Sequence, residues 1–134
     1  MDTNSTSPVA ELRLAVTVED FDGAVAFYRD ALGLPEVQAW DEAGGRGSIL
    51  DAGRATLELI SVDQAELIDR VEVGDRVGGP VRVALEVEDS AELAERLERA
   101  GAARLGGPVV TPWRHRNVRL EGPGLQLTLF TVLG

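Results

Sequence analysis

The side chains of this sequence that could do chemistry are few, and they include a single histidine. His115 stands between Arg114 and Arg116 in the segment Thr-Pro-Trp-Arg-His-Arg. An imidazole can act as an acid or a base near neutral pH, but the flanking arginines favour a solvated loop. The chain has no cysteine, which excludes disulfides, thiolate nucleophiles and zinc-thiolate sites. The sequence also contains no phosphate-binding loop, nucleophile elbow or dinucleotide fingerprint.

Large aromatic side chains form a second group of candidates. Trp40 and Trp113 lie beside predicted loops, where packing in a core is a poor explanation for a large apolar side chain. Together with Phe130 they are candidates for stacking on a planar ligand. Phe27 and Tyr28 recur at helical spacing and are expected to pack in the core instead.

Charged side chains alternate with apolar ones in two stretches that must position them. In Leu12 to Val18, leucine and valine alternate with Arg13, Ala15 and Thr17. In Val81 to Val87, valine and leucine alternate with arginine, alanine and glutamate. Strict alternation predicts strands with one apolar face and one polar or small face.

The two stretches belong to an internal duplication. Each leads through Val-Glu-Asp into a helical pattern that ends at a glycine. Arg82 follows Arg13 by 69 residues, and Asp89 follows Asp20 by the same number. A constant offset across a strand and its helix cap indicates two copies of one unit. The predicted helices span 20–33 and 90–101; further strands are expected at 36–40, 48–51, 55–61, 109–110, 116–120 and 125–132, and a linking helix at 63–71.

Length and charge exclude several classes of protein. A chain of 134 residues is large enough to bury a core as one domain. With a net charge of −10, binding to nucleic acid or to an anionic membrane is not expected. No apolar run is long enough for a membrane span, and residues 1–8 lack the features of a secretory signal. We therefore expect a flexible tail over 1–8 and a cytoplasmic location.

These features together resemble the vicinal oxygen chelate superfamily, which includes glyoxalase I, extradiol dioxygenases, fosfomycin-modifying enzymes and bleomycin-binding resistance proteins. The resemblance rests on the duplicated units and on the segments FYRDALGL, ATLEL and EGPGLQLTLF. It implies an α+β fold of two tandem βαβββ modules, which form a cup-shaped, half-open mixed β-barrel with helices outside. One domain would then span 9–134, with module one at 9–62, a link at 63–80 and module two at 81–134.

The resemblance also implies which residues face a ligand in the cup, and that the protein is a homodimer. Trp113 would lie at the mouth of the cup. The expected ligand-binding residues are Arg13, Thr17, Trp40, Glu58, Arg82, Glu86, Trp113, Gln126, Thr128 and Phe130.

The metal ligands of the superfamily's enzymes are not kept. Those enzymes hold a cation with His or Gln on each first strand and Glu on each last strand. The corresponding positions here are Arg13, Arg82, Glu58 and Thr128. Arginine carries only donors and stays protonated, so one carboxylate remains, whereas a metal site needs about three protein ligands. We expect no metal and no other cofactor.

Arg13, Glu58 and Arg82 are expected to converge in the cup, where two interpretations stay open. An arginine with free N–H groups could bind a ligand carboxylate or amide carbonyl. The three charges could instead neutralise one another, since buried charges are normally paired.

Three functions remain compatible with this sequence. The first is metal-independent binding of an aromatic or cationic small molecule, in antibiotic resistance or natural-product sequestration. The second is a cofactorless or metal-dependent lyase, isomerase or dioxygenase-like enzyme, with Glu58 as the candidate catalytic base. The third is a structural or regulatory module with an occluded cup.

Overall fold

The computed structural model describes residues 10–11, 13–42, 45–56 and 58–134. The expected tail at 1–8 lies outside these residues. None of the helices in the described part is long and apolar enough to cross a membrane. The elements are α1 (Phe21–Val25), the π-helix η1 (Ala26–Ala31), β1 (Glu36–Glu42), β2 (Gly45–Leu50), α2 (Val62–Glu72), β3 (Val83–Glu86), α3 (Ser90–Arg99), β4 (Ala103–Val110), β5 (His115–Gly122) and β6 (Leu125–Val132).

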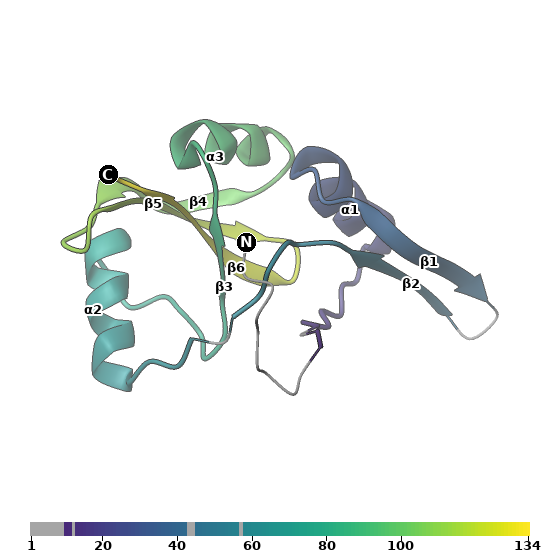
Figure 1. Cartoon of the computed structure of the whole chain (residues 1–134), viewed down its shortest axis with the longest axis horizontal. Helices are drawn as coiled ribbons and strands as arrows, with labels where there is room; N and C mark the ends of the chain where they lie inside the picture. Colours follow the sequence, from purple (N-terminus) through teal and green to yellow (C-terminus); the bar gives the residue numbers. More distant parts are fainter. Residues whose placement is uncertain (1–9, 12, 43–44, 57) are drawn as a thin grey trace.

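A four-stranded sheet forms the centre of the molecule (Figure 1). Its strand order is β3-β6-β5-β4, with β3 parallel to β6 and the other pairs antiparallel. Helix α3 connects β3 to β4, so this half of the chain is the predicted βαβββ unit. The sheet is mixed and does not close into a barrel, which confirms the predicted α+β class and half-open arrangement.

The apolar face of this sheet carries the core. Leu93 and Leu97 of α3 pack with the fully buried Val118 and Leu120 of β5, and Phe27 of η1 joins them. Burying one such side chain contributes about 1.5–3 kcal/mol. The helical spacing in α3 and the alternation in β5 and β6 therefore meet in one apolar layer, as the sequence predicted.

The ends of the duplicated helices follow the predicted caps. The carboxylate of Asp20 accepts from the backbone N–H of Gly23 at 3.0 Å, and the carboxylate of Asp89 accepts from the backbone N–H of Glu92 at 3.1 Å. Gly33 and Gly101, which follow the two helices, have φ angles of +94° and +114°. Only glycine adopts this backbone region without strain.

Helix α2 lies on the opposite, polar side of the four-stranded sheet from α3 (Figure 1). It contacts β4 and β5, and its C-terminal end comes very close to β4. A Cβ atom at Gly106 would collide with the carbonyl oxygen of Glu72. The link between the two halves of the chain therefore occupies part of the surface that the sequence assigned to the cup.

The first half of the chain is less regular than predicted. Strands β1 and β2 pair as an antiparallel hairpin that extends away from the larger sheet (Figure 1). The strands expected at 12–18 and 55–61 are not formed in the described parts of these stretches, and Leu12 and Leu57 lie outside the description. Neither stretch joins a backbone ladder there, so Leu14 and Leu59 stay 50% and 83% exposed.

Candidate functional site

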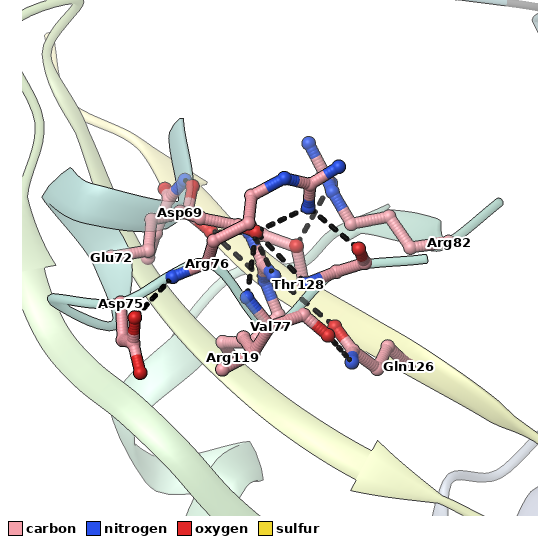
Figure 2. A network of polar contacts seen from close by, with 11 residues as sticks. Asp69, Glu72, Asp75, Arg76, Val77, Arg82, Arg119, Gln126 and Thr128 are labelled. Carbon is pink, nitrogen blue, oxygen red and sulfur yellow. Dashed lines mark hydrogen bonds and ion pairs between the residues drawn. The ribbon is translucent and has the colours of Figure 1, made fainter. Parts of the chain in front are cut away.

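A buried arginine on β5 is the centre of the polar layer under α2. The side chain of Arg119 has no exposed surface. Its guanidinium donates to a carboxylate oxygen of Asp69 at 2.9 Å and to one of Glu72 at 2.8 Å (Figure 2). Because neighbouring residues point to opposite faces of a strand, Arg119 faces α2 while Val118 and Leu120 face α3.

Helix α2 brings the two carboxylates to this arginine. Asp69 and Glu72 are three residues apart, which places them on one side of a helix. Both are almost fully buried, at 2% and 3% exposure. The helix begins after Ser61, whose hydroxyl accepts from the N–H of Gln64 at 3.2 Å.

The second oxygen of Asp69 holds the loop that follows α2. It accepts from the side chain of Arg76 at 2.6 Å and from the backbone N–H groups of Val77 and Gly78 at 3.0 and 2.8 Å (Figure 2). Burial by itself would raise the pKa of Asp69. The hydrogen bonds from Gly78, Arg76, Arg119 and Val77 outweigh it and lower this pKa to about 2.

Two amide side chains complete the polar layer. Gln126 donates to the carbonyl of Val77 at 2.9 Å and accepts from Arg119 at 3.1 Å, so both ends of its amide are engaged (Figure 2). Asn117 donates to Glu72 at 2.6 Å, while its Oδ1 has no hydrogen-bond partner among the described residues. Apart from this oxygen, the buried side-chain nitrogen and oxygen atoms of the layer all have hydrogen-bond partners among the described residues.

Arg82, just before β3, differs from the other two arginines of this region. Its guanidinium donates to the hydroxyl of the buried Thr128 at 2.9 Å. None of the ion pairs among the described residues includes it. Burial lowers the pKa of Arg82, and the neighbouring Arg119 charge lowers it further, against smaller opposing effects of Glu72, Glu58 and Asp69.

The part of the polar sheet surface along β3 and β6 is not covered by α2, and we call it the open face. Ala84 pairs with Thr128 and Glu86 with Phe130, so these four side chains share one side of the sheet. Ala84 and Glu86 are exposed, whereas Phe130 is partly exposed. The open face consists of Arg82, Ala84, Glu86, His115, Thr128 and Phe130.

A shallow groove continues the open face at the end of β3. It has a volume of about 490 Å³ and is lined by Glu86, Val87, Glu88, Thr131 and Val132. The open face therefore offers a cation at one end, and an aromatic ring beside carboxylates at the other end.

The sequence predicted that His115 lies on a solvated loop, and this prediction is wrong. His115 is the first residue of β5 and is partly buried. Its ring stacks on Phe130 with the two centroids 5.0 Å apart. The alternation of β5 places it on the same side as Asn117 and Arg119, because the strand extends one residue further than expected.

The predicted meeting of Arg13, Glu58 and Arg82 in one buried cluster is wrong. Arg13 is exposed and pairs with Glu11 at 3.3 Å. Glu58 is also exposed and acts on Arg82 only through its charge. The segments that should carry Arg13 and Glu58 do not join the sheet, and α2 supplies the buried carboxylates instead.

The other predicted ligand-binding residues are divided between the two halves. Glu86, Gln126, Thr128 and Phe130 lie on the polar side of the four-stranded sheet with Arg82. Thr17 is exposed outside any strand, and Trp113 lies in the turn between β4 and β5. Trp40 is on β1, where it lines a separate groove with Phe21 and Arg46.

Sequence analysis missed Asp69, Glu72 and Arg119 as members of the site. A signal for the arginine exists: β5 alternates Val118 and Leu120 with Asn117 and Arg119, so its polar side chains share one face. No comparable pattern in the sequence pairs Arg119 with a helix about fifty residues earlier in the chain.

The residues present do not fit the metal site of the superfamily's enzymes. The resemblance places Arg13 and Arg82 at two of the ligand positions, and arginine offers only hydrogen-bond donors. Thr128 stands at a third, and its hydroxyl already accepts from Arg82. In the described part of the chain, no three His, Asp or Glu side chains are grouped as metal ligands would be.

Comparisons with known proteins agree with this architecture. A family model for the Glyoxalase/Bleomycin resistance protein/Dioxygenase superfamily matches residues 12–125, whereas no curated protein matches the chain. TnmS3, an antibiotic binding protein from Streptomyces sp. CB03234, is 22% identical with a TM-score of 0.62, over 95% of this chain and 99% of its own. UcmS2 is 22% identical with a TM-score of 0.54, over 89% of this chain and 98% of its own. A glyoxalase-related enzyme from Fulvimarina pelagi is 17% identical with a TM-score of 0.56, over 92% of this chain and 88% of its own.

We predict that Glu72→Ala destabilises the protein by about 3–5 kcal/mol, because it leaves the buried Arg119 with one carboxylate and removes the acceptor of Asn117. Adding Arg119→Met should restore part of this loss in a double-mutant cycle measured by urea unfolding. Glu98→Ala is the control, since it breaks the partly exposed pair with Arg104 and should cost about 1 kcal/mol or less. Equal losses for Glu72→Ala and Glu98→Ala would contradict the buried layer.

We also predict acid sensitivity from Asp69. Its folded pKa of about 2 lies below its ordinary value of 3.8, so its ionised form stabilises the folded state. This contribution, about 2 kcal/mol, is complete above pH 4 and disappears as the pH falls through about 2. The free energy of unfolding should therefore fall more steeply between pH 4 and 2 in the parent than in Asp69→Asn. Glu95→Gln, which changes an exposed carboxylate on α3, should keep the parent's slope; a parental slope in Asp69→Asn would refute the assignment.

Proposed function

As its sequence pattern predicted, this chain belongs to the Glyoxalase/Bleomycin resistance protein/Dioxygenase superfamily, and we propose that it binds a small molecule without a metal. The ligand lies on the open face of the four-stranded sheet. Sequestration of an antibiotic or another natural product is the role that fits this binding best.

The open face is the observation that carries the proposal. Its surface combines different chemical groups: Arg82 carries N–H donors that no described residue accepts, Phe130 offers a ring, and Ala84 leaves room between them. Binding sites for small molecules typically combine apolar surface with a few polar groups that fix orientation. A module with an occluded cup would not leave Ala84 and Glu86 exposed on this side.

One further fact supports independence from a metal, and another supports the binding of a small molecule. The superfamily's ligand positions hold Arg13, Arg82 and Thr128 here, which do not suit a divalent cation. Among the solved structures with this fold, TnmS3 is an antibiotic binding protein that aligns with 95% of this chain.

A cofactorless enzyme is the second candidate, and the position of His115 favours it. Its ring stacks on Phe130 at the open face, 5.0 Å between centroids, so a proton acceptor and the guanidinium of Arg82 border the same surface. The two candidates differ in what happens to the bound molecule: an enzyme would convert it into a product, whereas a binding protein would release it unchanged.

We propose in addition that the protein is a homodimer. Leu14, Val16, Leu59 and Ile60 lie in the two stretches that form no strand in the described residues, and they are 38–83% exposed. Residues 13–18 keep the alternation of a strand, and exposed apolar side chains in such a stretch favour a partner surface. A second copy of the chain supplies a matching apolar surface.

The binding proposal is tested by incubating the protein with a library of aromatic natural products and bleomycin, and identifying retained compounds by mass spectrometry. We expect retention of one compound per subunit, recovered unchanged. Ala84→Trp should abolish retention by filling the open face, whereas Ala103→Trp, at an exposed position on the edge strand β4, should not. A compound recovered in altered form would favour the enzyme, and a library without any retained compound would count against both.

The dimer is tested by analytical ultracentrifugation at micromolar concentration. We expect about twice the 14.3 kDa mass of the chain. Leu59→Asp should shift the protein toward monomer because it places a charge in the apolar contact. Val110→Asp, at a 60% exposed position on β4, is the matched control and should stay dimeric. A monomeric parent protein would overturn the proposal.

A further inference from the structure

The charges beneath and beside α2 do not balance. Three guanidiniums, those of Arg76, Arg82 and Arg119, meet two buried carboxylates, those of Asp69 and Glu72. Buried and half-buried charges are normally paired. One positive charge in this region is therefore left without a close negative partner among the described residues.

Arg82 carries the unmatched charge. All three nitrogens of the Arg119 guanidinium donate to side chains of the layer, and Arg76 donates to Asp69 and to the carbonyl of Gly78. Among the described residues, Arg82 makes one hydrogen bond, to the hydroxyl of Thr128. A guanidinium has five N–H donors in a planar fork, so most of the donors of Arg82 are not taken up by this part of the chain.

Arg82 lies at one end of the open face, beside the buried Thr128. It precedes β3 on the same side of the sheet as Ala84, and its hydrogen bond to Thr128 fixes it beside β6 (Figure 2). The exposed Ala84 adjoins it, and the ring of Phe130 lies further along the same side. A flat molecule anchored at Arg82 would thus extend over apolar surface.

Glu58 is the acidic side chain outside the buried layer that acts on Arg82. Its charge opposes the lowering of the pKa of Arg82. However, Glu58 is exposed and no ion pair among the described residues joins the two. Glu58 therefore competes with a negatively charged ligand for Arg82, and solvent weakens this competition because Glu58 is exposed.

We infer that Arg82 binds a carboxylate of the ligand, so that the protein selects planar organic acids over neutral and cationic molecules. A carboxylate accepts two parallel N–H groups of a guanidinium, which is the geometry that Arg82 leaves open. This inference rests on the proposed function and replaces the expectation of a cationic ligand.

The inference is tested by calorimetric titration with three matched probes: 2-naphthoate, 2-naphthamide and 2-naphthylmethylamine. The parent protein should bind 2-naphthoate at least about tenfold more tightly than either other probe, because hydrogen bonds between ionised partners are the stronger ones. Arg82→Gln should weaken 2-naphthoate binding by about the same factor. Glu58→Gln should strengthen it, because a competing charge is removed. Arg116→Gln, which removes an exposed arginine of β5, is the matched control and should have no effect.

A stability measurement separates recognition from a structural role. Arg82→Gln should unfold at the same temperature as the parent or at a higher one, since it removes a positive charge beside Arg119. A lower unfolding temperature with unchanged 2-naphthoate binding would make Arg82 structural and overturn the inference. Equal binding of 2-naphthoate and 2-naphthamide would also overturn it, while leaving the proposed function in place. That function fails separately, if the natural-product library yields no retained compound.

Discussion

The buried guanidinium of Arg119 and its two carboxylates are the interaction on which the rest of this structure depends. Removing these charges from water costs several kcal/mol for each ion, so the group adds little net stability compared with apolar packing. What it supplies is specificity: α2 can satisfy Arg119 only in one position and rotation, with Asp69 and Glu72 turned to the sheet. The link between the two halves of the chain is thereby fixed to the second half.

The position of α2 then decides where a ligand can lie. The helix packs over β4 and β5, whereas Ala84 and Glu86 of β3 stay exposed on the same side of the sheet. It also uses both buried carboxylates for Arg119 and Arg76, so Arg82 has no such partner. The contacts of α2 therefore close one part of the cup and also leave Arg82, in the other part, without a buried carboxylate as partner.

Local patterns predicted the second half of the chain well and the first half poorly. Helix α3 and strand β6 were predicted because caps, helical spacing and alternation are recorded in neighbouring residues. The stretches 12–18 and 55–61 carry the same alternation, but a strand also needs a partner backbone, which no local pattern supplies. Arg13 and Glu58 were misplaced for that reason. Arg119 was missed because its partners lie on a helix far away in the sequence, and the charges that Asp69 and Glu72 carry there are typical of a solvated helix face.

The spacing of charges along β3 gives the open face a direction. Arg82 and Glu86 lie on the same side of an extended segment, four residues and about 13 Å apart. A molecule placed along this strand meets a positive charge at one end and a negative charge at the other. The two head-to-tail orientations of a molecule with unlike charges at its ends therefore differ in electrostatic energy even when its shape is symmetrical. This difference favours the orientation that places the more positive end in the groove beside Glu88.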